Sequence, residues 1–169
     1  MTDPDYFVDG IDTREGPIRR VSREQMDAMV GTEAAVSPWT AVDQQMVDAF
    51  ANLTRDRFFI HVDPERAARE APHGGTILHG FLTLSMLPHM TYQVCPFVEG
   101  TKSMLNYGFN RLRFVAPVPT GSRIRGRFFL NAFEVSAEGR WTATWNVTVD
   151  IEGAERPAIV AEWLSVGFL

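Results

Sequence analysis

The chain has 169 residues, 45% of them hydrophobic and 22% charged, an ordinary balance for one globular domain with a substantial core. Its net charge of −5 argues against a protein that binds nucleic acid through phosphates. The sequence holds no run of about twenty apolar residues that could span a membrane. Cys95 is the single cysteine, which excludes an intrachain disulfide and fits a cytoplasmic location.

The N-terminal part predicts an arm followed by a short helix. Residues 1–20 are polar, contain proline and glycine, and lack the basic and apolar parts of a secretory signal. Ser22 and Gln25 match a capping box, so a helix is expected to run from there to about Val30. We therefore assign residues 1–35 to an arm with a short helix, and residues 36–169 to the main domain.

Two further helix starts are visible before the middle of the chain. Asp43 has the position of an N-cap for a helix that ends near Arg55, which places Asp56 at its exit. Asp63 is expected to cap a turn that begins at Pro64.

One segment is apolar almost all round. From 77 to 87 the residues are nearly all hydrophobic, which favours a buried central helix over a strand, with Pro88 near its end.

The second half alternates apolar and polar residues, as half-buried strands do. The expected strands cover about 105–115, 124–130, 141–150 and 158–168. A shift of the apolar phase predicts a β-bulge near Asn110, and arginines at 123, 125 and 127 predict a solvated face. Strands that are apolar on one side need a helix to cover that side. The expected fold is therefore α+β, with a curved antiparallel sheet wrapped around the central apolar helix.

The chemistry is concentrated where a carboxylate and an imidazole stand five residues apart, at Asp56 and His61. Such a pair can hold one water between them, and a helix that starts nearby, at His79-Gly80, offers backbone N–H groups to a developing negative charge. These are the parts of a site that adds or eliminates water. The structural alternatives are that Asp56 only bonds a neighbouring N–H and that His61 is a satisfied core histidine.

The segment 56–88 resembles the MaoC-like, R-specific enoyl-CoA hydratases of the hotdog fold, and within them the nodulation protein N-like group. The hydratase pattern runs Asp-x-Asn-Pro-aliphatic-His. Asp56, Ile60 and His61 match it, whereas Phe58 and Phe59 replace the Asn-Pro. The resemblance extends over about residues 36–168 and includes Ala67, Gly74, Gly75, the stretch 79–85, Tyr107 and the stretch 113–119.

The resemblance implies that the chain adds water to a trans-2-enoyl thioester of coenzyme A or acyl carrier protein, or runs the reverse reaction. Asp56 and His61 would be the catalytic pair, and the Gly80 N–H would bind the thioester oxygen. Candidate substrate-binding residues are Phe58, His79, Phe81 and Tyr107, although His79 could instead cap the central helix, a structural role that its position favours. A homodimer is implied as well.

Neither a metal nor another cofactor is expected, because the histidines lack the spacing of a metal motif. Two other functions remain open. The Phe58-Phe59 replacement suggests a non-catalytic acyl-thioester-binding protein, and a hotdog thioesterase would use the carboxylate to direct water to the carbonyl.

Overall fold

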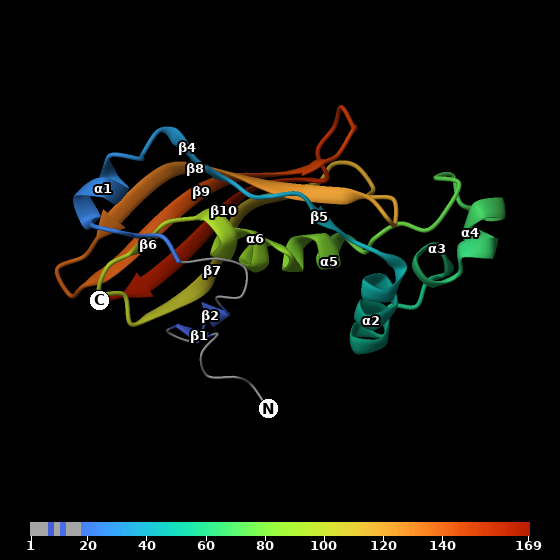
Figure 1. Cartoon of the computed structure of the whole chain (residues 1–169), viewed down its shortest axis with the longest axis horizontal. Helices are drawn as coiled ribbons and strands as arrows, with labels where there is room; N and C mark the ends of the chain where they lie inside the picture. The colour runs from blue at the N-terminus through green and yellow to red at the C-terminus, as the bar shows by residue number, and fades with distance from the viewer. Residues whose placement is uncertain (1–6, 9–10, 13–17) are drawn as a thin grey trace.

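A curved antiparallel sheet wraps around one helical rod in the computed structural model, which describes residues 7–8, 11–12 and 18–169 (Figure 1). The strand order is β4-β8-β9-β10-β7, and β5 also pairs with β8. The strands are β4 (Thr32–Val36), β5 (Thr40–Ala41), β7 (Ser103–Phe114), β8 (Arg123–Val135), β9 (Arg140–Ile151) and β10 (Ile159–Phe168). The predicted α+β architecture is confirmed.

Strict alternation explains which face of the sheet meets the helix. On β9 every second side chain is buried, namely Trp141, Ala143, Trp145, Val147, Val149 and Ile151. The paired strand β8 contributes Ile124, Phe128 and Leu130 to the same core. Each of these larger side chains stabilises the fold by roughly 1.5–3 kcal/mol when it is fully buried, so this face fixes the strand register.

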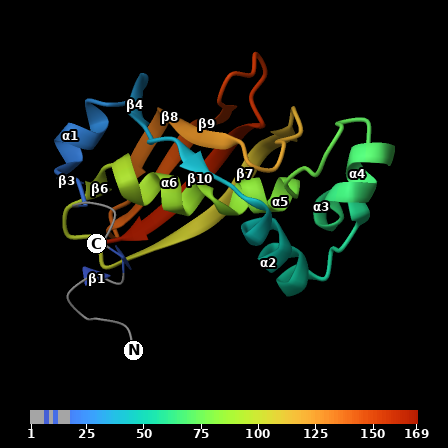
Figure 2. The same cartoon turned by 45° about the vertical axis from the view of Figure 1, so that its right-hand side comes forward.

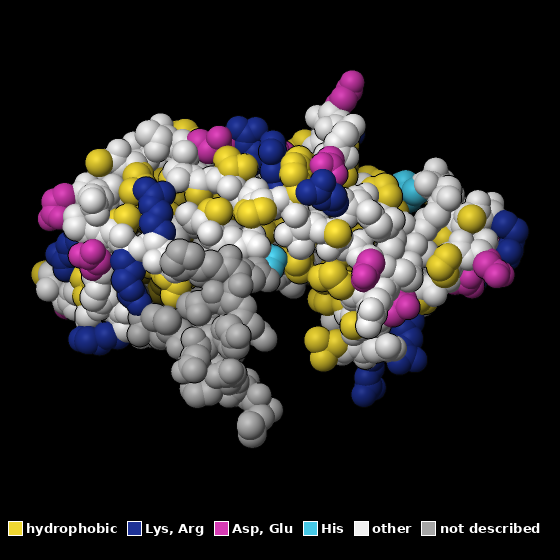
Figure 3. Space-filling view, in the orientation of Figure 1, with side chains coloured by type: hydrophobic (Ala, Val, Ile, Leu, Met, Phe, Trp, Pro, Cys, Tyr) yellow, Lys and Arg dark blue, Asp and Glu magenta, His cyan; other side chains and the backbone are white. Residues whose placement is uncertain are grey.

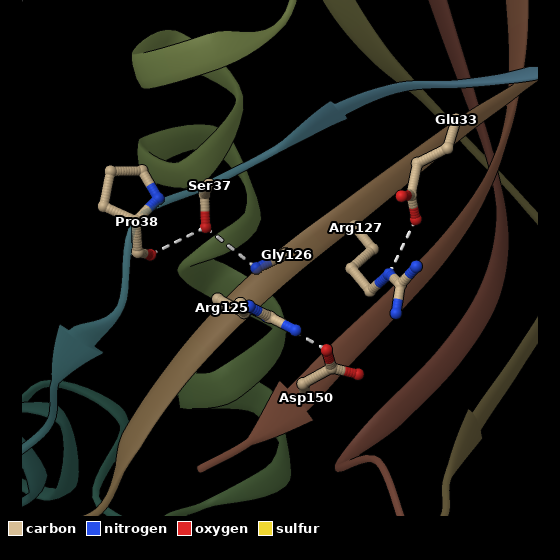
Figure 4. Close-up of polar contacts among 7 residues, drawn as sticks. All are labelled: Glu33, Ser37, Pro38, Arg125, Gly126, Arg127 and Asp150. Atoms are coloured by element: carbon tan, nitrogen blue, oxygen red, sulfur yellow. Dashed lines mark hydrogen bonds and ion pairs between the residues drawn. The ribbon is translucent and has the colours of Figure 1, made fainter.

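The opposite face of β8 carries ion pairs instead of a nucleic-acid surface. Arg123 pairs with Glu152 (2.9 Å), Arg125 with Asp150 (3.1 Å) and Arg127 with Glu33 (2.6 Å), the last two drawn in Figure 4. Pairs at a surface contribute about 0–1 kcal/mol each. The prediction of a solvated face is therefore confirmed. Acidic and basic side chains are also interspersed across the visible surface in Figure 3.

A buried serine ties the end of β4 to β8. The Ser37 N–H donates to the Gly126 carbonyl (2.8 Å), and the Gly126 N–H donates to Ser37 Oγ (2.9 Å). The Ser37 hydroxyl in turn donates to the Pro38 carbonyl (2.9 Å; Figure 4). These bonds satisfy a buried hydroxyl and hold the chain against β8 between β4 and β5.

Strand β7 forms an edge of the sheet and contains two irregularities. Along its pairing with β10, the register skips Asn110, which confirms the predicted bulge, and it skips Tyr107 as well, which the sequence analysis did not predict. Among the described strands only β10 pairs with β7, so its other edge is open.

The central helical rod consists of α5 (Gly80–Ser85) and α6 (Leu87–Val94), with Met86 between them. The prediction that the helix runs from 77 to 87 was wrong at both ends. Pro88 does not end the rod, because it lies in the first turn of α6, where a missing N–H costs no hydrogen bond. No helix of the described residues is long and apolar enough to cross a membrane.

The helices α2 (Gln44–Thr54), α3 (Phe59–Val62) and α4 (Pro64–Glu70) gather beside the start of α5 (Figure 2). As predicted, the Asp43 side chain caps α2 by accepting from the Met46 N–H (2.9 Å). Asp63 likewise caps α4, whose first residue is a proline. These caps fix the segment between α2 and α4, which contains the candidate site.

The N-terminal part contributes small elements at the other end of the molecule. The predicted capping box of Ser22 and Gln25 is confirmed, but α1 (Arg23–Asp27) ends earlier than expected. Short strands pair as β1 (Phe7–Val8) with β2 (Ile11–Asp12), and β3 (Arg20–Val21) with β6 (Phe97–Val98). The remainder of the predicted arm, 1–6, 9–10 and 13–17, lies outside the described residues. Strand β4 begins at Thr32, within the segment 1–35 that we assigned to the arm.

Candidate active site

Asp56 follows the end of α2 directly. Arg55 ends that helix in the left-handed conformation (φ 65°) and turns the chain so that Asp56 leads into α3. The Asp56 side chain is exposed. Its main-chain carbonyl accepts a hydrogen bond from His79 Nε2 at 2.9 Å. The carboxylate is therefore accessible to solvent while its backbone is fixed.

His61 lies in α3 and is buried. Its Nδ1 is 2.7 Å from the carbonyl oxygen of Ile77. Because a carbonyl can only accept, Nδ1 carries the proton, and the neutral ring keeps a lone pair on Nε2. Burial lowers the pKa of His61, although the bond to the Ile77 carbonyl opposes this; nearby His79 lowers it further and Asp56 raises it. Nε2 is therefore the ring nitrogen that can accept a proton.

The structure brings Asp56, His61 and His79 together. One carboxylate oxygen and one nitrogen of each ring lie within 4.8 Å of one another. The two imidazoles stack with ring centroids 3.8 Å apart and planes inclined by 24°. Nearly parallel rings keep their in-plane lone pairs in separate, almost parallel planes, whereas a bound metal ion needs lone pairs that converge on one point. The cluster is better suited to handling a proton than to holding an ion.

Gly80 is the first residue of α5, so its N–H has no partner within the helix. A Cβ at this position would come within 3.0 Å of Phe114 Cδ1. A side chain here would force the Phe114 ring to shift, so glycine lets the helix start lie close to β7. Next to it is a cavity of about 280 Å³, whose lining includes His61, Gly80, Thr83, Phe114, Val118 and Ile159.

The other predicted substrate-binding residues do not line this cavity. Phe58, Phe81 and Tyr107 are 58%, 65% and 62% exposed on the single chain. Phe81 packs edge-on against Phe114, with ring centroids 5.6 Å apart. Phe114 lines the cavity, so its ring separates Phe81 from it. His79 is buried and stacks on His61. It occupies the N-cap position of α5, but its side chain makes no capping hydrogen bond. The expectation that this side chain caps the helix was wrong.

The Phe58-Phe59 pair has a structural position. Phe58 is the N-cap of α3 and Phe59 its first residue, and no side chain caps this helix. Asparagine is a preferred N-cap and proline a preferred first helical residue. The replaced Asn-Pro of the hydratase pattern therefore corresponds to a helix start, and its loss removes a capping signal.

Two more cavities follow the same side of the central rod, where it faces β7. One of about 310 Å³ is lined by Leu84, Ser85, Leu87, Pro88, Asn106, Phe109 and Trp163. The next, of about 100 Å³, shares Pro88, Asn106 and Trp163 with it and extends to Tyr92 and Cys95. None of these residues was predicted from the sequence to belong to a site. Their signal was present only in the apolar periodicity of the helix and β7, which equally fits a core.

Comparisons with known proteins identify the family. The family described as MaoC like domain matches residues 25–151. Nodulation protein N of Rhizobium leguminosarum bv. viciae is 45% identical over 88% of this chain and 92% of its own length. The 3-hydroxyacyl-thioester dehydratase Z of Mycobacterium tuberculosis (strain ATCC 25618 / H37Rv) is 46% identical over 80% of this chain and 88% of its own length.

Solved structures share the fold. An (R)-hydratase from A. caviae involved in PHA biosynthesis superposes with a TM-score of 0.61 at 24% identity, covering 78% of this chain and 91% of that one. A MaoC-like dehydratase from Rhodospirillum rubrum superposes with a TM-score of 0.62 at 21% identity, covering 79% of this chain and 88% of that one. On the strength of the family match and of relatives above 40% identity, the chain belongs to the MaoC-like dehydratase family of hotdog-fold enzymes.

Proposed function

We propose that the protein hydrates trans-2-enoyl thioesters to (3R)-hydroxyacyl thioesters, or catalyses the reverse dehydration. The observation that carries this proposal is the convergence of the Asp56 carboxylate and the His61 imidazole beside the Gly80 N–H and a cavity. The name of the mycobacterial relative, a 3-hydroxyacyl-thioester dehydratase, supports the same substrate class.

The tautomer of His61 suggests the order of proton transfers. A water held between the two groups gives a proton to His61 Nε2. The second O–H of this water donates to the Asp56 carboxylate, which orients the water. The water oxygen forms a bond to C3 as the C2–C3 double bond shifts toward the thioester carbonyl. The Nε2 proton then passes to C2, so one water is added and His61 is neutral again.

Negative charge gathers on the thioester oxygen between these steps. The Gly80 N–H at the start of α5 is the proposed donor to this oxygen. Removal of one such donor typically costs about 100- to 1000-fold in rate. The missing Cβ supports this role, because it lets the helix start lie against the Phe114 ring of β7.

The acyl chain has an apolar route away from the reacting carbons. Beyond the cavity at His61 and Gly80, two further cavities lie between the central rod and β7, and these two share lining residues and reach toward Tyr92 and Cys95. We propose that the chain extends along this line, with coenzyme A or an acyl carrier protein outside. Contacts of Phe58, Phe81 and Tyr107 with the substrate stay predictions.

A homodimer is the proposed assembly. Strand β7 presents an open edge with exposed apolar side chains, among them Leu105, Tyr107 and Phe114. Such an edge is a template for pairing with another strand, and a two-fold axis would pair β7 with its own copy. The free and buried Cys95 fits the cytoplasmic location that we predict.

The proposal is tested by incubating the protein with crotonyl-CoA and longer trans-2-enoyl-CoA substrates. Loss of the enoyl-thioester absorbance with formation of the (3R)-alcohol supports hydration. Release of free thiol, measured with a chromogenic reagent, would indicate a thioesterase instead. Tight binding by calorimetry without turnover of any chain length would indicate a non-catalytic binder.

A further inference from the structure

His79 is a buried titratable side chain that the proposed mechanism does not use. It is 3% exposed, and its Nδ1 has no hydrogen-bond partner among the described residues. A buried imidazole nitrogen without a hydrogen-bond partner lowers the stability of the fold. The other contacts of the ring must therefore explain why a histidine stands here. Besides a ring contact with Phe50, it has two contacts that lead to the proposed catalytic pair.

The first contact fixes the main chain of Asp56. His79 Nε2 lies 2.9 Å from the Asp56 carbonyl oxygen, which can only accept, so Nε2 carries the proton. On the other side, Arg55 turns the chain in the left-handed conformation. The Asp56 N–H adds only a long contact of 3.5 Å to Thr54 Oγ1. The bond from His79 is therefore the strongest anchor recorded for this exposed residue.

The second contact supports the His61 ring. The His79 ring stacks on His61 (3.8 Å between centroids), and its own neighbour is Phe50 at 5.1 Å. His61 is held at one edge by the Ile77 carbonyl. His79 covers one of its faces and so limits rotation of the ring out of its plane.

We propose that His79 is a positioning residue for the hydration reaction: its N–H fixes the Asp56 backbone, and its ring holds the His61 imidazole in place. This inference rests on the proposed function of Asp56 and His61. It assigns His79 a neutral ring with the proton on Nε2. A second proton, on Nδ1, would add a buried donor without a partner and would place a positive charge beside His61.

Two substitutions separate the two contacts. His79→Phe keeps a ring against His61 but loses the donor to Asp56. His79→Gln loses the ring but keeps an N–H donor at a similar distance along the side chain. His89→Phe is the matched control, because His89 is a half-buried histidine on α6, away from the cluster.

The decisive experiment is a double-mutant cycle on crotonyl-CoA hydration with Asp56→Asn. We expect His79→Phe to lower kcat about 10- to 100-fold with KM changed less than about threefold, because a misplaced group costs rate more than binding. In the Asp56→Asn background the same substitution should cost less than about threefold. His79→Gln should recover at least half of the loss on a logarithmic scale, and His89→Phe should change little. An equal loss in both backgrounds would overturn the positioning role.

An activity-independent measurement separates this proposal from the proposed function. In ¹⁵N NMR spectra of the folded wild-type protein, the His79 ring is expected to carry its proton on Nε2 near neutral pH. A proton on Nδ1 would contradict the proposal even if the enzyme hydrates crotonyl-CoA. Conversely, wild-type protein that shows the expected tautomer but no turnover would refute the hydratase and leave the contact with Asp56 intact. The same spectra report whether each variant is folded.

Discussion

The Nδ1 atom of His61 donates to the carbonyl oxygen of Ile77 across 2.7 Å, and this contact leaves Nε2 as the nitrogen that can accept a proton. It joins α3 to the segment before the central helix, whose Ile77 N–H also donates to the Ile60 carbonyl (2.9 Å). The same two segments thus position the base and lead the chain to Gly80. The fold and the proposed chemistry meet at this pair of hydrogen bonds.

The pH dependence of the reaction follows from the burial of His61. Burial lowers its pKa below the ordinary value of 6.5, so the neutral, proton-accepting form persists below that pH. Activity in hydration should be complete above 6.5 and fall as pH drops through the lowered pKa. The measurement is kcat/KM for crotonyl-CoA from about pH 4.5 to 8. An acid limb with its midpoint above 6.5 would contradict this assignment.

Gly80→Ala should reduce kcat through a steric effect, because the N–H itself is retained. The new Cβ would meet the Phe114 ring at 3.0 Å and push the start of α5 away from β7. We expect a loss of roughly 10- to 100-fold, the cost of a small displacement of a catalytic group. Phe114→Leu in the same chain should restore part of the rate, and Phe114→Leu alone serves as the control. Full activity of Gly80→Ala would show that this contact yields without affecting the site.

Phe58→Asn should stabilise the protein without a large change in rate. Phe58 occupies the N-cap of α3 with no side-chain hydrogen bond, and asparagine can accept from the first free N–H groups. The expected gain is about 1 kcal/mol in the free energy of unfolding, measured by denaturant titration. A kcat changed by more than about tenfold would mean that Phe58 contacts the substrate.

Leu105→Glu should convert the proposed homodimer into a monomer. Leu105 is 59% exposed on the open edge strand, and a charge buried in an interface without a partner is strongly unfavourable. Val160→Glu, at an exposed apolar position on β10, is the matched control and should leave the assembly unchanged. Molar mass by light scattering after gel filtration decides the matter. A wild-type monomer at micromolar concentration would contradict the interface.

Local signals in the sequence predicted the features that local physics controls. The caps of Asp43 and Asp63 depend on residues three positions away, and the burial of β9 follows its alternation. The phase shift at Asn110 revealed one bulge of β7. The bulge at Tyr107 left no comparable trace, because the apolar pattern of an exposed edge strand does not specify its register there.

Features that depend on tertiary closure were not predictable in the same way. The role of Pro88 was misjudged, because a proline is compatible with either the end of one helix or the first turn of the next. The stacking of His61 on His79 joins residues eighteen positions apart, and it depends on how α3 packs beside the start of α5. The spacing of Asp56 and His61 indicated a water-handling pair, and His79 was named as a candidate substrate-binding residue, but its contacts with both members of the pair emerged only from the fold.

The most direct test of the account is the steady-state rate of crotonyl-CoA hydration by wild-type protein, Asp56→Asn, His61→Gln and the double variant. If the two side chains act on one water as a unit, each single substitution should lower kcat by at least about 1000-fold, and the double variant should lose little more. If both single variants hydrate crotonyl-CoA at the wild-type rate, Asp56 and His61 are not the catalytic pair.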